Sequence, residues 1–358
     1  MTRRRLLNPG PVTLAPSVRA ALASAPDLCH REPEFAALQQ SVRDELASLY
    51  GSASDYSTTL ITGSGTAAVE AMLISLVPEG SSVLVAANGV YGQRMAAMAS
   101  RAGVGHVIVE SGITDPIDFA EVARRLAAHP EVSHIAAVHH ETTIGRLNDL
   151  GQLAEVAAGR PILLDAVSSF GAEDIRFDEW NIEAGAATAN KCLHGVPGIA
   201  FVVARRDALL EPRRQSPSVY LDLRANHLAQ EDGYPQFTPA VQSLIALDAA
   251  LLELQAAGGW RGRGERYRSL MDRVRNGLAV HRVDTLLPPA ENAASLTSFR
   301  MPSGHDFDGL FQPLSAADFV IYPGQRQLYK EIFRIAVMGN LSDEDVDELV
   351  SVFGTILG

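Results

Sequence analysis

The chain has 358 residues, of which 47% are hydrophobic and 20% are charged, as is typical of a soluble globular protein. Its formal net charge of −12 argues against nucleic acid as a partner, because nucleic acids bind basic surfaces. Two cysteines, Cys29 and Cys192, are too few for a disulfide framework, which favours a reducing cytoplasm. No stretch approaches the roughly 20 apolar residues that span a bilayer, and the basic start lacks the apolar core of a signal peptide. We therefore expect a cytoplasmic protein without membrane contact.

The first distinctive feature is an irregular segment, residues 6–14, whose Asn-Pro-Gly-Pro core cannot lie inside a helix. Helical periodicity follows over residues 16–24 and 34–50. A short strand, residues 58–62, then runs directly into Gly63-Ser64-Gly65-Thr66 and a helix. Free amides, hydroxyl groups and the helix dipole favour an anion such as phosphate at this turn. A tight turn closed by a serine cap explains the same pattern equally well.

Strands and helices alternate as far as residue 204, which predicts a mostly parallel, doubly wound α/β sheet. The predicted strands cover residues 58–62, 82–86, 104–109, 135–138, 161–164, 184–190 and 199–204. The predicted helices between them cover residues 67–76, a segment that ends near residue 102, and residues 119–128. In such sheets, ligands bind at the carboxyl ends of the strands.

The stretch from Pro161 to Gly198 carries the strongest chemical signal. A buried apolar strand ends on Asp165, and a second strand leads to Lys191. A lysine can hold pyridoxal 5′-phosphate as a Schiff base, while an aspartate pairs with the protonated pyridine nitrogen. Taken alone, a helix cap at Asp165 and a solvated Lys191 are the commoner explanation for such residues at strand ends.

Two other strand ends add to this signal. Tyr91 lies in a loop where it is placed to stack on a flat ring, although a single loop tyrosine more often packs on its own domain. The hydroxyl of Thr142 is placed to reach a ring oxygen. The neighbouring His139 and His140 suggest a metal, but no third ligand stands at useful spacing. A phosphate turn, an aromatic ring, a hydroxyl, an acid and a lysine at successive strand ends together describe a site for pyridoxal phosphate.

The C-terminal third has a different pattern. Residues 205–240 are polar and predicted as a loop, and a long helix over 240–257 ends at Gly258-Gly259, a usual helix stop. Beyond it we expect a small α+β domain whose last helix is capped by Ser342. Its elements are predicted over residues 262–278, 295–300, 319–322, 333–338 and 342–355. The predicted organisation is an N-terminal segment at the active site (1–14), a large cofactor-binding domain (15–257) and a small domain (258–358).

Eight segments of the chain resemble the fold-type I aminotransferases of the alanine–glyoxylate and serine–pyruvate branch. They are LLNPGPVTL, TGSGTAAVEAML, ANGVYGQRM, HHETTIGRLN, LLDAVSSFGA, ATANKCLHGVPGIAFV, FVIYPG and FRIAVMG. The resemblance is colinear over nearly the whole chain, and ETTIGRLN, DAVSSFG and NKCLHGVPG are its most specific parts. It implies a fold-type I transferase that depends on pyridoxal 5′-phosphate and forms a homodimer with its active sites at the subunit interface.

The resemblance also assigns roles to individual residues. Lys191 would carry the cofactor, Asp165 would hold the pyridine nitrogen, and both would be catalytic. The other cofactor-binding residues would be Ser64, Gly65 and Thr66 at the phosphate, Tyr91 on the ring, Thr142 near the phenolic oxygen, Val167, Asn190, and Thr238 toward the cofactor phosphate of the other subunit. The substrate would meet Gly10 and Arg334, whose guanidinium fork suits a carboxylate and a phosphonate alike.

Within this branch, the segments are most similar to the members that transaminate 2-aminoethylphosphonate with pyruvate. Residues 239–242 and a shortened loop over 224–237 depart from that pattern near the expected substrate entrance. Transamination of alanine or serine with glyoxylate, or of a related aminophosphonate, therefore remains an alternative. No cysteine follows residue 192, which argues against a sulfur-transferring lyase. A non-catalytic anion-binding module that uses Gly63–Thr66 has no need for both Asp165 and Lys191.

Overall fold

The computed structural model describes residues 4–51 and 54–358. Its largest element is a seven-stranded sheet in the order β2-β10-β9-β8-β5-β3-β4. The strands are β2 (Tyr56–Gly63), β3 (Ser82–Ala87), β4 (Gly105–Glu110), β5 (Val132–Val138), β8 (Ile162–Asp165), β9 (Ile182–Thr188) and β10 (Gly198–Arg205). Strand β10 runs antiparallel to both of its neighbours, and the other pairings are parallel. The predicted mostly parallel sheet and all seven of its predicted strands are confirmed.

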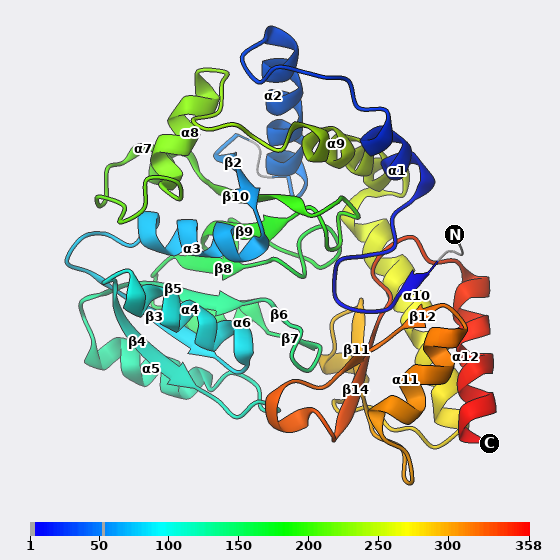
Figure 1. Ribbon diagram of the computed structural model, residues 1–358. Coiled ribbons are helices and arrows are strands. Elements are labelled where there is room, and N and C mark those ends of the chain that lie inside the picture. The colour runs from blue at the N-terminus through cyan, green and yellow to red at the C-terminus, as the bar shows by residue number, and fades with distance from the viewer. Residues whose placement is uncertain (1–3, 52–53) are drawn as a thin grey trace.

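Helices cover both faces of this sheet (Figure 1). They are α1 (Pro16–Ala23), α2 (Pro33–Ser48), α3 (Gly65–Leu76), α4 (Val90–Arg101), α5 (Phe119–Ala128), α6 (Leu150–Val156) and α9 (Val241–Ala256). Because side chains alternate along a strand, Val83 and Val85 of β3 pack in one apolar cluster with α3 and α4. Leu84 and Ala86 pack on the opposite face with residues of α2, α5 and α9. Burial on both faces explains why these strands are almost continuously apolar.

The elements that follow α9 in the chain lie together on the right-hand side of Figure 1. The helices there are α10 (Gly259–Val280), α11 (Phe307–Ala316) and α12 (Asp343–Leu357), and an antiparallel sheet has the order β11 (Leu296–Arg300), β14 (Ile332–Ala336), β13 (Tyr322–Pro323). Residues of α10, α11, α12, β11 and β14 share one apolar cluster, to which Leu7 and Val12 of the N-terminal segment also belong. Strand β1 (Arg5–Leu6) pairs in parallel with β12 (Phe319–Val320). The N-terminal segment therefore packs on the C-terminal elements before it reaches α1.

Two local predictions are wrong. Residues 205–240 are not a continuous loop, because they contain α7 (Arg206–Leu210) and α8 (Leu223–Glu231). Helix α8 begins where the side chain of Asp222 accepts a hydrogen bond from the amide of Ala225, at 2.9 Å. The predicted strand over 319–322 is divided between β12 and β13, which pair with different partners. The cap at Ser342 is confirmed, and its hydroxyl accepts from the amide of Asp345.

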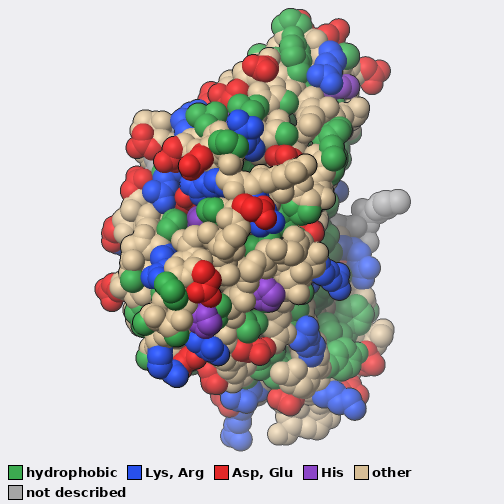
Figure 2. All heavy atoms as spheres, turned by 90° about the vertical axis from the view of Figure 1, so that its left-hand side faces the viewer, with side chains coloured by type: hydrophobic (Ala, Val, Ile, Leu, Met, Phe, Trp, Pro, Cys, Tyr) green, Lys and Arg blue, Asp and Glu red, His purple; other side chains and the backbone are tan. Residues whose placement is uncertain are grey.

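The surface on the left of Figure 1 faces the viewer in Figure 2, where acidic and basic side chains are interspersed. Among the described residues, no helix has both the length and the apolar character that crossing a membrane requires.

Candidate active site

The predicted site residues are brought to one edge of the large sheet by its topology. Asp165 is the last residue of β8, and Lys191 follows the parallel neighbour β9, so both stand at the same edge. Ser64 follows β2 at this edge and precedes α3, and Tyr91 follows β3 in the first turn of α4. The side chain of Ser64 makes no capping hydrogen bond to α3, so the serine-cap explanation of this turn is wrong.

A cavity that is partly open to solvent lies between these strand ends. Eight of the predicted site residues line it: Ser64, Gly65, Thr66, Tyr91, Asp165, Val167, Asn190 and Lys191. The others that line it are Arg94, Val138, His140, Ser168 and Thr188. An acid, an amine and a helix N-terminus thus meet in one space. Thr142, Arg334 and Gly10 do not line it, but Gly10 contacts Lys191 and Arg334 contacts Thr142.

Lys191 lies against the N-terminal segment. Its Nζ donates a hydrogen bond to the carbonyl oxygen of Pro9. Gly10 has a φ of +93°, and a Cβ added there would lie 2.6 Å from Cδ of Lys191. A residue without a side chain is therefore required at position 10, both for the backbone conformation and for the space that the lysine occupies.

The environment of Lys191 increases the fraction of its neutral amine. Burial lowers the pKa of Lys191 from 10.5 to about 8, and the positive charge of Arg334 lowers it further, against the opposing effects of Cys192 and Asp165. A neutral amine is the form that attacks a carbonyl group.

A pH dependence follows from this pKa. The rate at which added pyridoxal phosphate reacts with the protein is expected to rise as the pH increases through about 8 and to level off above it, because the amine fraction of Lys191 grows in that range. The measurement is the initial rate of the absorbance change on mixing at a series of pH values. A rate that keeps rising toward pH 10.5, as for an exposed lysine, would contradict the assignment.

Asp165 is buried, with 7% of its surface exposed, and its Oδ1 accepts a hydrogen bond from the amide of Val167 at 3.0 Å. Burial raises the pKa of Asp165 to about 6, while the Val167 amide and the charges of Lys191 and Arg94 act in the opposite direction. A buried carboxylate without an ion-pair partner among the described residues is suited to a cationic ligand such as a protonated pyridine.

Glu141 is a site residue that sequence reasoning missed. It lies in β6 (His140–Glu141), is fully buried, and accepts hydrogen bonds from the amide of Tyr91 at 3.2 Å and from the hydroxyl of Thr143 at 2.5 Å. A Cβ at Gly89 would lie 2.3 Å from its carboxyl carbon. The carboxylate therefore fixes the start of α4, and with it Tyr91. The one signal in the sequence was an acid among otherwise uncharged residues at a strand end.

Buried polar atoms without partners mark where a polar ligand fits. Among the described residues, Oγ1 of Thr142 and Nε2 of His140 make no hydrogen bond although both are buried. Nδ1 of His140 lies 3.0 Å from the carbonyl oxygen of Ser168, which assigns its proton to Nδ1 and leaves Nε2 as an acceptor. Such atoms are uncommon in folded proteins, and a hydroxyl at Thr142 fits a phenolic oxygen. The residues present therefore fit pyridoxal phosphate.

Arg334 is held rigidly beside the cavity. It is 2% exposed, and it donates to the carbonyl oxygens of Thr142 at 2.7 Å and Pro323 at 3.0 Å. Its guanidinium carbon lies 5.9 Å from the ring centre of Tyr322. Burial lowers the pKa of this guanidinium, while Tyr91, Tyr322 and Glu141 act to raise it. These contacts orient a cation that lies close enough to Lys191 to lower its pKa.

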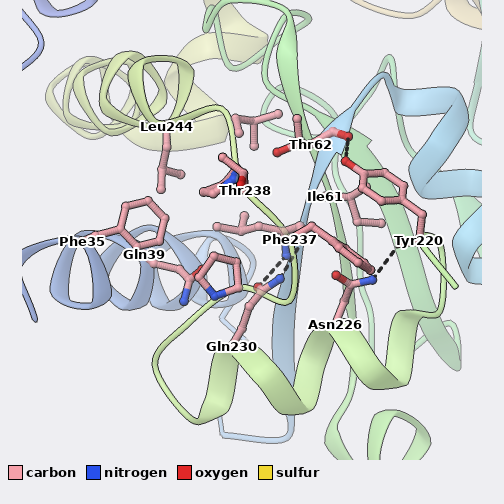
Figure 3. A pocket seen from close by; sticks show the side chains of 14 residues that line it. Phe35, Gln39, Ile61, Thr62, Tyr220, Asn226, Gln230, Phe237, Thr238 and Leu244 are labelled. Atoms are coloured by element: carbon pink, nitrogen blue, oxygen red, sulfur yellow. Dashed lines mark hydrogen bonds between the residues drawn. The ribbon is translucent and has the colours of Figure 1, made fainter. Parts of the chain in front are cut away.

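Thr238 lines a different cavity (Figure 3). That cavity lies between α2, β2, α8 and α9, and Phe237 and Thr238 point into it beside Thr62. The segment is tied to β2, because the amide of Ala240 donates to the hydroxyl of Thr62 at 3.0 Å. The structure therefore does not bring Thr238 to the cavity that contains Lys191 of the same chain.

Arg94 was also missed. It stands one helical turn after Tyr91 in α4, so the two side chains share a face of the helix. The spacing Tyr-Gly-Gln-Arg in the sequence was sufficient to find it once the helix was known.

Comparison with known proteins agrees with this geometry. The family model that describes the class-V aminotransferases matches residues 20–349 of this chain. A 2-aminoethylphosphonate–pyruvate transaminase of Bacillus cereus (strain AH820) is 35% identical over 361 residues, which cover 99% of this chain and 98% of the relative. The solved structure of an aspartate aminotransferase of subgroup IV from Thermus thermophilus is 26% identical, with a TM-score of 0.89 over 99% of both chains. An alanine–glyoxylate aminotransferase from Nostoc sp. shares the fold, with a TM-score of 0.92, 24% identity and coverage of 100% and 96%. The chain therefore belongs to the class-V aminotransferase family.

Proposed function

We propose that this protein transfers the amino group of 2-aminoethylphosphonate to pyruvate and releases phosphonoacetaldehyde and L-alanine. The observation that carries the proposal is the 35% identity, over 99% of the chain, to transaminases of that substrate pair. The cavity supports it, because it combines a lysine of lowered pKa, a buried carboxylate and a neighbouring arginine.

Pyridoxal phosphate, the cofactor of this family, supplies the group that accepts the amine and withdraws electrons from the substrate carbon. Lys191 would hold it covalently and, once released, would carry a proton between two carbons as general base and acid. Asp165 would keep the pyridine nitrogen protonated. Thr142 would contact the phenolic oxygen, and Ser64, Gly65 and Thr66 would bind the phosphate at the N-terminus of α3.

The proposal extends to the assembly. We propose a homodimer in which Thr238 of the partner subunit approaches the cofactor phosphate. This would give a role to a threonine that does not line the Lys191 cavity of its own chain. We also propose the division into an N-terminal segment (1–14), a large domain (15–257) and a small domain (258–358), and a cytoplasmic location.

Arg334 would bind the anionic group of donor and acceptor in turn. Replacing it with glutamine is expected to raise KM for both 2-aminoethylphosphonate and pyruvate, each by about 10- to 100-fold, because a charged hydrogen-bonding partner is lost in both half-reactions. Steady-state kinetics with each substrate varied will measure this effect. The matched control is Arg300→Gln, which removes an exposed arginine from the adjacent strand β11. An increase in KM for one substrate alone would show that Arg334 is not a shared clamp.

A donor screen tests the proposed function directly. 2-Aminoethylphosphonate, its hydroxylated analogue, L-alanine and L-serine are compared as donors, with pyruvate and glyoxylate as acceptors. The proposal expects the highest kcat/KM for 2-aminoethylphosphonate with pyruvate. If L-alanine or L-serine with glyoxylate gave a far higher kcat/KM, the phosphonate assignment would be wrong, while the aminotransferase assignment would stand.

A further inference from the structure

The phosphate-binding turn assigned above contains no full positive charge. Ser64, Gly65 and Thr66 offer hydroxyls and amides, and the N-terminus of α3 adds the equivalent of about half a charge. A phosphate monoester carries about −1.5 to −2 charges at neutral pH. In the proposed function, Lys191 already binds the cofactor aldehyde, and Arg334 already binds the anionic group of the substrate. The charge of the phosphate therefore calls for another cation.

Arg94 is the cation that the structure places at this position. Its Nη1 lies 3.5 Å from the hydroxyl of Thr66, and its guanidinium carbon lies 4.8 Å from the ring centre of Tyr91. It lines the same cavity as Ser64, Thr66 and Lys191, and its charge lowers the pKa of Asp165. Among the described residues, no carboxylate forms an ion pair with Arg94. Its side chain is exposed, so it has room to approach a ligand.

We propose that Arg94 binds the phosphate of the cofactor, as an extension of the function proposed above. A guanidinium presents two parallel N–H groups to a phosphate, which suits an arginine at this position better than a lysine. The location separates this role from that of Arg334. Arg94 contacts Thr66 at the phosphate turn, whereas Arg334 contacts Thr142 and packs against Tyr322. Arg94 is thus a cofactor-binding residue, and the substrate anion is left to Arg334.

The test compares two ligands that differ only in the phosphate, pyridoxal 5′-phosphate and pyridoxal. Their dissociation constants are measured by equilibrium dialysis for the wild type, Arg94→Gln, Arg94→Lys and Arg101→Gln. Arg101 is an exposed arginine at the end of the same helix, so its variant controls for the loss of one charge from α4. Thermal unfolding without added ligand checks that each variant is folded.

In Arg94→Gln, the dissociation constant of pyridoxal phosphate is expected to rise by about 10- to 100-fold, the usual range for losing a charge-assisted hydrogen bond, while that of pyridoxal stays within about 2-fold. Arg94→Lys is expected to lie between the wild type and Arg94→Gln, and Arg101→Gln to match the wild type. Equal weakening of both ligands would overturn the proposal, because Arg94 would then act on the ring through Tyr91. Unchanged affinities with an increased KM for 2-aminoethylphosphonate would also overturn it, by assigning Arg94 to the substrate. In both cases wild-type binding at Lys191 would leave the proposed function standing, whereas a wild type that binds neither ligand would contradict both.

Discussion

Replacing Lys191 with alanine is expected to lower kcat by about 10⁴-fold, the upper range for the loss of a positioned general acid and base. The same change removes the amine that would hold the cofactor covalently. An amine added in solution is not expected to restore the activity of this variant. Lys191 is positioned by the contact of its Nζ with Pro9, and its pKa is lowered to about 8, and a free amine has neither property. The fold is expected to persist, since the side chain borders an open cavity and forms no part of the apolar clusters.

The composition of the chain makes this experiment unusually selective. The sequence contains only two lysines, Lys191 and Lys330, and Lys330 is exposed. Borohydride reduction after addition of pyridoxal phosphate, followed by peptide mass spectrometry, should find one pyridoxyl group, on Lys191. Lys330→Ala is the matched control and should keep both the adduct and the activity. An adduct on Lys330 together with retained turnover in Lys191→Ala would contradict the assignment.

The second large effect is expected for Asp165→Asn. An amide of the same shape fits the buried position but cannot stabilise a proton on the pyridine nitrogen, so kcat should fall by about 10²- to 10³-fold, as for other single electrostatic contacts in active sites. The variant should still bind pyridoxal phosphate, because Lys191 and the α3 turn are unchanged. Bound cofactor per chain and kcat are measured together.

Asp174→Asn is the control for this variant, because it removes a surface carboxylate that pairs with Arg176. Its kcat should equal that of the wild type. If Asp165→Asn also kept full activity, the carboxylate would have no part in the reaction. Complete loss of cofactor from Asp165→Asn would instead assign it a role in binding alone.

The sequence was sufficient for the sheet and for the strand-end residues because both depend on local patterns. Apolar runs of strand length, such as the one that ends on Asp165, define buried parallel strands, and their carboxyl ends must share one edge. Helices α7 and α8 were missed because residues 205–240 are polar, and α8 depends on a single cap at Asp222 and on contacts with β2 that are distant in the sequence.

The missed site residues share a different cause. Glu141 acts through the amides of α4, and Arg94 acts through its distance from Thr66, and neither relation is visible before the chain is folded. The contact of Pro9 with Lys191 joins residues 182 positions apart. Residue type and spacing can therefore suggest the ligand of a site, but the groups that orient or complete the site depend on tertiary contacts.

The most direct test of the proposed reaction is the stoichiometry of its two halves. Protein loaded with pyridoxal phosphate is mixed with excess 2-aminoethylphosphonate without an acceptor, and phosphonoacetaldehyde is quantified. Pyruvate is then added after the donor is removed, and alanine is quantified. A transaminase that stores the amino group between two half-reactions should form about one aldehyde and then about one alanine per chain. No aldehyde before pyruvate is added, or aldehyde in continuing excess over the number of chains, would contradict the account.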